Sequence, residues 1–177
     1  MHALSIEKER VWWREAAIVV AWSLALGLLG KLMIPLPFSP VPLALRSQIV
    51  LLMAALLGPR RAAAAVIGFL AQGLVGLPVF THGAAGWGAL IGPNGGYLVG
   101  YVAAAVVTGW LAKRSLPAAL VAGTAVIYLF GAGYLATFVG IEKALWLGIV
   151  PFLILDAVKI AMNWAIVKSI RLKFQSQ

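Results

Sequence analysis

Long apolar runs alternate with short polar or Pro/Gly-rich segments along the whole chain. Four prolines in residues 35–42 end the first run, because proline removes a backbone donor and cannot continue a helix. The uncharged stretch 62–112 is too long for one membrane span of about 20 residues. Residues 78–96 divide this stretch, and their six glycines indicate a folded loop rather than a helix. The pattern predicts an all-α membrane protein with one domain over residues 1–177 and six spanning helices, at about 16–34, 43–57, 62–77, 96–112, 117–140 and 145–167.

Positive charge is concentrated in the segments that connect these spans on the side of the termini. Ten of the fourteen Lys and Arg residues fall there: Lys8, Arg10, Arg14, Arg60, Arg61, Lys113, Arg114, Lys168, Arg171 and Lys173. Cytoplasmic loops of membrane proteins carry such an excess of Lys and Arg. We therefore expect both termini to be cytoplasmic, with loop 1 (residues 35–42) and loop 3 (residues 78–96) facing outside.

The composition excludes several classes of protein. The chain is 63% hydrophobic and 11% charged, whereas soluble domains are about 25% charged, so lipid must cover much of the surface. The net charge of +9 does not indicate nucleic-acid binding, because the basic clusters lie between apolar runs. There is no cysteine, and His2 and His82 are the only histidines. We expect no metal site, no cofactor and no enzyme activity, since a nucleophile–base pair is missing.

Charged and amide side chains within the last span are the main candidate site. Asp156 and Lys159 share one helical face at i, i+3 spacing, and Asn163 continues that face. In a continuous helix Asp156 would lie roughly 16 Å from Leu145 along the axis, near the middle of the membrane. Charge there is costly and must face other helices or a wet cavity. Three interpretations remain open: an ion pair that locks helix packing, a binding site, and a proton or ion relay.

The outward loops contribute three further candidates. Asn94 either contacts a ligand or stabilises a turn. Trp87 either forms a flat apolar wall or belongs to the interfacial belt of aromatic residues. Arg46, just after loop 1, either clamps a carboxylate with two hydrogen bonds or extends to lipid headgroups.

Small residues repeat every four positions along the first helix, at Ala17, Ala21 and Ala25. Such a stripe lets a second helix approach closely. It indicates either packing within this chain or docking on a partner membrane subunit.

Three segments, taken in order, are similar to the BioY family, the biotin-specific S-components of energy-coupling-factor transporters. They are residues 37–42, residues 76–80 with 92–97, and the stretch from Pro151 through Asp156 to Lys159. The resemblance implies six helices around a vitamin pocket that opens outward and is capped by loops 1 and 3. Ala44, Arg46 and His82 depart from the usual residues of the family, which affects the expected contacts of loop 1.

The resemblance also implies a function and partners. It implies a bacterial inner-membrane subunit that captures biotin from outside for import. Asp156 and Lys159 match the polar pair that contacts biotin, and Asn94 lies in a loop expected near the ligand. The implied partners are a membrane scaffold subunit, which would dock on the alanine stripe, and cytoplasmic ATPases. The sequence leaves open whether the chain forms a homo-oligomer, and an autonomous proton-coupled carrier using Asp156 is the alternative function.

Overall fold

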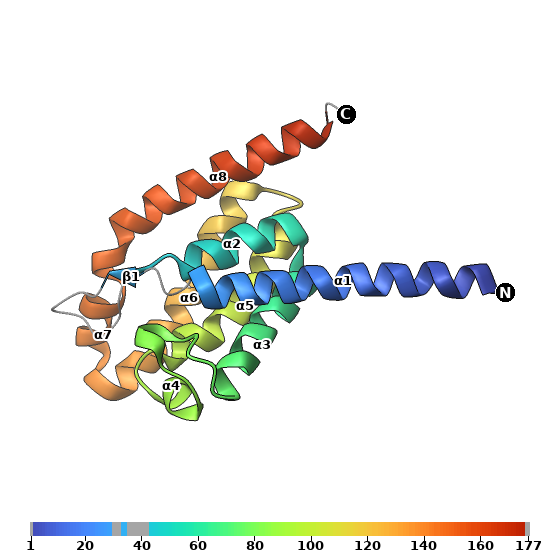
Figure 1. Cartoon of the computed structure of the whole chain (residues 1–177). Helices are drawn as coiled ribbons and strands as arrows, with labels where there is room; N and C mark the ends of the chain where they lie inside the picture. The colour runs from blue at the N-terminus through green and yellow to red at the C-terminus, as the bar shows by residue number, and fades with distance from the viewer. Residues whose placement is uncertain (1, 30–32, 35–42, 176–177) are drawn as a thin grey trace.

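The protein is a bundle of helices with one very short hairpin (Figure 1). The structure is a computed structural model that describes residues 2–29, 33–34 and 43–175, and the side chains of residues 11–29 and 45–173. Loop 1, expected to cap the pocket, lies outside the described residues. The elements are α1 (His2–Leu29), β1 (Met33–Ile34), β2 (Leu43–Ala44), α2 (Arg46–Leu57), α3 (Pro59–Leu74), η1 (Thr81–Gly83), α4 (Trp87–Ile91), α5 (Gly95–Leu111), α6 (Leu116–Val139), α7 (Ile141–Gly148), η2 (Val150–Phe152) and α8 (Leu153–Gln175).

Helices α5 and α6 form the centre of the bundle, and small residues let them approach closely. A Cβ added to Gly100 would lie 2.9 Å from the Phe130 side chain. The Thr108 hydroxyl donates to the Ala119 carbonyl, 3.4 Å away, across the same pair of helices. Small and hydroxyl-bearing residues are typical of helix contacts inside membranes. The α5–α6 pair therefore provides a tightly packed framework on which the other helices rest.

Helix α1 is held against α3 by a polar contact within an otherwise apolar region. The Gln72 amide donates a hydrogen bond to the Ser23 hydroxyl. Gly68 lies opposite, and a Cβ there would come within 2.9 Å of the Ser23 oxygen. Figure 1 shows that the N-terminal part of α1 extends well beyond the bundle.

The first helix differs from the sequence prediction at both ends. It begins at His2 instead of residue 16 and ends at Leu29 instead of residue 34. Met33 and Ile34 pair instead with Ala44 and Leu43 in an antiparallel hairpin, so the predicted start of the second helix at Leu43 is also wrong. The apolar run marks where a helix can meet lipid, whereas hydrogen bonding lets the helix continue through charged residues outside it. The predicted third, fourth and fifth helices differ from α3, α5 and α6 by at most three residues at either end, whereas the last helix ends at Gln175 instead of residue 167.

The predicted sixth helix is broken into two. Helix α7 ends at Gly148, the turn η2 follows, and α8 begins at Leu153. Pro151 lies in this break. Its ring and its missing backbone donor interrupt a continuous helix, which explains the break. Asp156 consequently lies in the first turn of α8 and not midway along one unbroken helix. We call residues 148–153 the α7–α8 elbow.

Loop 3 contains more regular structure than its glycine content predicts. Helix α4 covers Trp87–Ile91 and the turn η1 covers Thr81–Gly83, so the expectation of no helix within residues 78–96 is wrong. The segment 87–91 has ordinary helix-forming residues at four of five positions, and Gly92 with Pro93 ends it. The backbone of Gly86 donates to the Gly73 carbonyl at 2.7 Å, which ties loop 3 to the end of α3.

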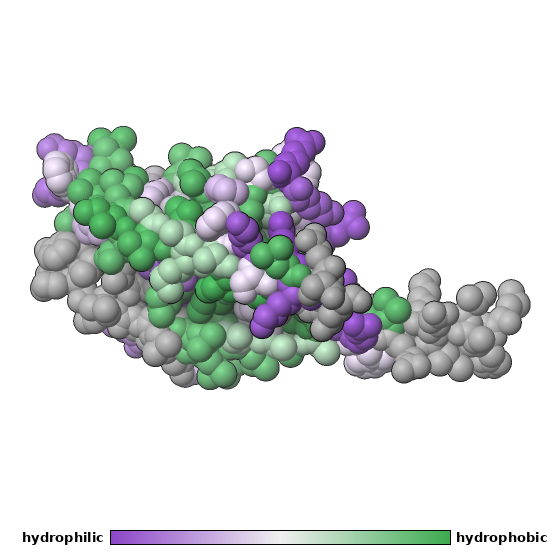
Figure 2. Space-filling model, turned by 90° about the horizontal axis from the view of Figure 1, so that it is seen from above, coloured by the Kyte–Doolittle hydropathy of each residue, from purple (hydrophilic) through white to green (hydrophobic). Residues whose placement is uncertain are grey.

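Within the described residues, three segments are long and apolar enough to cross a membrane: Val11–Leu29, Leu116–Val139 and Ile141–Lys173. Arg46–Leu57 and Gly95–Leu111 are shorter apolar helices. Figure 2 shows apolar residues over the middle of one face and hydrophilic residues mainly toward the end nearer α1. The predominantly helical fold class is thus confirmed, and the surface is that of a membrane protein.

The ends of several helices meet at the same side of the bundle. Arg171 of α8 donates to the carbonyls of Ala55 (3.1 Å) and Ala112 (3.2 Å), which lie at the C-terminal ends of α2 and α5. Arg61 pairs with Glu15 of α1 nearby in the fold. Both chain termini point to this side, whereas α4 and α7 lie at the opposite one (Figure 1).

Candidate binding site

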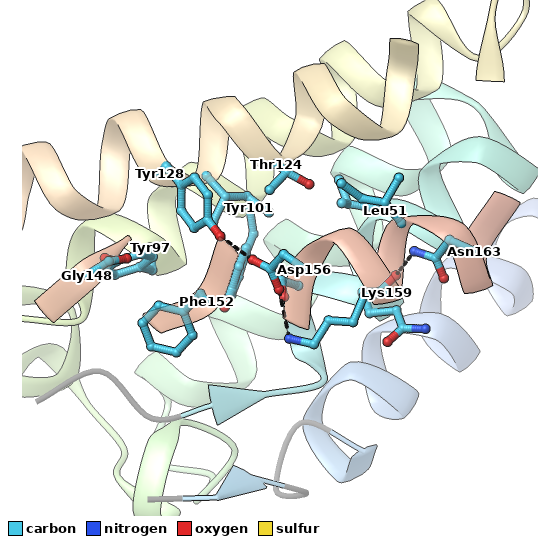
Figure 3. A pocket seen from close by; sticks show the side chains of 14 residues that line it. Leu51, Tyr97, Tyr101, Thr124, Tyr128, Gly148, Phe152, Asp156, Lys159 and Asn163 are labelled. Atoms are coloured by element: carbon cyan, nitrogen blue, oxygen red, sulfur yellow. Dashed lines mark hydrogen bonds and ion pairs between the residues drawn. The ribbon is translucent and has the colours of Figure 1, made fainter. Parts of the chain in front are cut away.

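A hollow lies between α2, α5, α6, α8 and the α7–α8 elbow (Figure 3). It contains about 570 Å³ of space, including the part that opens to solvent. The described residues that line it are Ser47, Gln48, Leu51, Tyr97, Tyr101, Thr124, Ile127, Tyr128, Gly148, Phe152, Asp156, Lys159, Ile160 and Asn163. Three of the six predicted ligand contacts are in this set, all from α8.

The Asp156 carboxylate is held by two partners from two helices. The Lys159 ammonium lies 3.0 Å from Oδ1, and the Tyr128 hydroxyl of α6 donates to Oδ2 at 2.5 Å. The side chains of Asp156 and Lys159 are 14% and 13% exposed. The i, i+3 spacing therefore brings the two charged groups together as an ion pair, and the pair faces the hollow.

Asn163 forms the end of the hollow beyond Lys159 and is 1% exposed. Its Nδ2 donates to the backbone carbonyl of Gln48, 3.1 Å away on α2. Its Oδ1 is buried and accepts no hydrogen bond from any described residue. A buried acceptor without a partner costs about 1–3 kcal/mol, so this oxygen is suited to receive a donor from a guest molecule or water.

Aromatic side chains form the apolar part of the hollow. Tyr97 and Tyr101 lie one helical turn apart on α5 and both face it, and Phe152 of the elbow lies close by (Figure 3). This wall takes the place predicted for Trp87, which is 68% exposed on α4. Trp87 is outside the set of described residues that line the hollow.

Arg46 and Asn94 also lie apart from this lining set. Arg46 is 2% exposed, donates from Nη2 to the Val79 carbonyl at 2.9 Å, and stacks on the Phe69 ring at 5.0 Å. Asn94 precedes α5 as its N-terminal cap residue. Contacts of Arg46, Asn94 and Trp87 with a ligand stay predictions.

The alanine stripe lies mainly on the outer surface of α1. Ala17 and Ala21 are exposed and Ala25 is half-buried, whereas Ser23 and Leu26 face the bundle. Packing within this chain therefore involves the other face of the helix. This leaves most of the stripe accessible to a second protein or to lipid.

Sequence reasoning missed the contribution of α2, α5 and α6 to the hollow. Tyr128 and Thr124 are four residues apart, as are Tyr97 and Tyr101, and such spacing places each pair on one helix face. Paired polar side chains inside apolar spans are the signal that could have identified them. Gln48 carried a comparable signal at the start of α2.

Apolar spans that surround a partly enclosed, partly polar hollow define a helical membrane protein with an internal binding site for a small molecule. Residues 4–176 match the BioY family. The chain belongs to the BioY family. Because this is a family of transport proteins, the prediction that the chain is no enzyme is confirmed.

Individual relatives agree with this assignment. A biotin transporter BioY of Thermotoga maritima is 38% identical over 79% of this chain and 85% of its own length. A biotin transporter BioY of Rhizobium etli is 38% identical over 81% of this chain and 82% of its own. Among solved structures, the S-component for biotin from an ECF-type ABC transporter superposes with a TM-score of 0.79, at 26% identity and 93% coverage of both chains.

Proposed function

We propose that this protein is the biotin-binding membrane subunit, or S-component, of a vitamin uptake transporter. In this role it captures biotin from outside the cell for import. The observation that carries the proposal is the hollow in which Asp156, Lys159 and Asn163 of α8 face an aromatic wall. Relatives that carry the name biotin transporter cover most of the chain and support the choice of ligand.

The chemistry of the hollow suits both halves of the biotin ring system. The ureido group offers two N–H donors and one carbonyl acceptor. Asp156 and the Asn163 carbonyl accept hydrogen bonds, and Lys159 donates them. The aromatic wall around Tyr97 and Phe152 suits the apolar body of the bicyclic ring.

The proposed topology has six spans, with α7, η2 and α8 together forming the sixth. Both termini are cytoplasmic, and loops 1 and 3 cap the pocket on the outside. Support comes from the basic residues at the ends of the helices, where Arg61 and Arg171 lie on the side of the termini. A bacterial inner membrane is the proposed location.

The proposed partners are a membrane scaffold subunit and cytoplasmic ATPases, because the solved relative is the S-component of an ECF-type ABC transporter. The exposed positions Ala17 and Ala21, with Ala25, provide a surface for the scaffold. No observation favours the proton-coupled carrier, whereas the relatives that carry the name biotin transporter support the main proposal.

Isothermal titration of the purified protein in detergent with biotin tests the proposal directly. We expect saturable heat and a rise in the unfolding temperature, because a ligand that binds only the folded state stabilises it. Thiamine, which lacks the ureido group, serves as the control ligand and should give neither. Absence of heat and of stabilisation with biotin would overturn the proposed function.

A further inference from the structure

Tyr128 connects the ligand-facing carboxylate to a different helix. Its hydroxyl donates to Oδ2 of Asp156 across the gap between α6 and α8, at 2.5 Å (Figure 3). Lys159 approaches the other oxygen, Oδ1, from within α8 at 3.0 Å. The carboxylate is therefore held from both sides, once by its own helix and once by a neighbour.

This arrangement leaves part of the carboxylate available. An ionised carboxylate has about four lone-pair sites on its two oxygens. Tyr128 donates to one oxygen and Lys159 to the other, so lone-pair sites remain that can accept donors from a guest in the hollow. A carboxylate that is already oriented avoids the loss of side-chain freedom on binding, which costs about 0.5–1.5 kcal/mol for a flexible side chain.

Tyr128 contributes its hydroxyl group, and not only its ring, to the hollow. Tyr128 is half-buried and lines the hollow together with Thr124, one turn earlier on α6. The Thr124 hydroxyl is turned to its own helix, where it donates to Leu120 at 3.0 Å. Tyr128 thus supplies a hydrogen bond that reaches from α6 to α8.

From these contacts we infer that Tyr128 is a positioning residue for the ligand. It holds the Asp156 carboxylate in the orientation in which that group accepts the N–H donors of a ureido ligand. This inference rests on the proposed function. Tyr128 acts through Asp156, so its effect on affinity depends on the carboxylate being present.

The test compares Tyr128→Phe with Tyr134→Phe by isothermal titration with biotin. Tyr134 lies on the same helix and its hydroxyl is also bonded, to the Ile91 carbonyl at 3.0 Å, but away from the lining of the hollow. We expect Tyr128→Phe to weaken biotin binding about tenfold, equivalent to about 1.4 kcal/mol. Tyr134→Phe should stay within about twofold of the unmodified protein.

A double-mutant cycle with Asp156→Asn separates positioning from packing. In the Asp156→Asn background, Tyr128→Phe should weaken binding by less than about threefold further, because hydrogen bonds to neutral groups are roughly half as strong. An equal tenfold loss in both backgrounds would overturn the inference, since Tyr128 would then act without the carboxylate. Unchanged affinity of Tyr128→Phe would overturn it as well.

A folding control and a substitute variant distinguish a loss of affinity from a loss of folding. Thermal unfolding of each variant without ligand identifies a folding defect, and Tyr128→Met, which fills space without a hydroxyl, replaces Tyr128→Phe if that variant does not fold. If the unmodified protein binds no biotin, the proposed function fails. If it binds biotin and Tyr128→Phe binds equally well, only the positioning role fails.

Discussion

Tyr97 of α5 donates a hydrogen bond to the backbone carbonyl of Gly148 at the end of α7, with 2.8 Å between the two oxygens. The bond connects the centre of the bundle to the elbow at which the chain turns into α8. Asp156 lies in the first turn of α8, so the position of the elbow determines the position of the carboxylate. Tyr97 therefore contributes to the hollow twice, as part of its wall and as the support of its α7–α8 side.

The close fit of Tyr97 against α6 gives a prediction about stability. Gly131 lies directly against the Tyr97 ring, and a Cβ added there would overlap the ring atoms. Gly131→Ala should therefore displace Tyr97 or strain the helix pair, at a cost of about 1–3 kcal/mol. The measurement is the thermal unfolding temperature in detergent, which should fall.

Gly133 provides the matched control on the same helix. A Cβ added to Gly133 meets no described atom within 4 Å, and alanine is a better helix former than glycine by about 1 kcal/mol. Gly133→Ala should leave the unfolding temperature unchanged or raise it. Equal destabilisation by both substitutions would show that the Tyr97 contact is not the cause.

The sequence predicted the helices well where they coincide with apolar runs and poorly where they do not. Helix α6 differs from its predicted range by only one residue at each end. The agreement is close because Pro117 and Gly140 mark the two ends of one continuous apolar stretch. Helix α1 was misjudged at both ends, since hydrophobicity does not measure how far a helix continues outside lipid. The break at the elbow was missed although Pro151 signals it.

For the candidate site, the sequence located one wall and missed the others. Asp156, Lys159 and Asn163 were identified because polar groups on one face of an apolar helix need an explanation. Tyr128 and Gln48 come from other helices, and their approach to α8 depends on how the helices pack. Periodicity within one helix does not contain that information, so their hydrogen bonds could not be predicted from the sequence.

The Asp156–Lys159 pair should contribute strongly to affinity if the hollow binds biotin. Asp156→Asn and Lys159→Ala should each weaken binding at least tenfold, about 1.4 kcal/mol, because each removes one charged hydrogen-bonding partner. Isothermal titration gives the affinities. Lys168→Ala is the control, because it also removes a lysine from α8, but one that stacks on Trp164 and lies outside the lining of the hollow. Unchanged affinity in folded variants of the pair would assign Asp156 and Lys159 a purely structural role.

Arg46 should contribute to stability through its contact with loop 3. Arg46→Met keeps an apolar side chain of similar length but removes the donor to Val79, and a buried carbonyl that loses its donor costs about 1–3 kcal/mol. We expect Arg46→Met to have a lower unfolding temperature than Arg114→Met, the control variant in which an exposed arginine is changed. An equal effect of the two substitutions would contradict this expectation.

The same Arg46→Met protein also tests whether the guanidinium clamps the carboxylate of the ligand. A clamp requires that the variant lose more affinity for biotin than for biotinamide, whose side chain carries no negative charge. Equal losses for the two ligands would exclude a direct contact between Arg46 and the carboxylate.

The exposed part of α1 should be needed for assembly and not for ligand capture. Ala21→Phe places a large ring in the alanine stripe, where close approach of a second helix requires a small residue. We expect the variant to bind biotin normally while its co-purification with the membrane scaffold subunit is lost. Val20→Phe enlarges a neighbouring exposed residue outside the four-residue repeat and should retain the subunit. If Ala21→Phe retained the scaffold subunit, the alanine stripe would not be the docking surface and would contact lipid. A helix-docking interface cannot accept a phenylalanine at its point of closest approach.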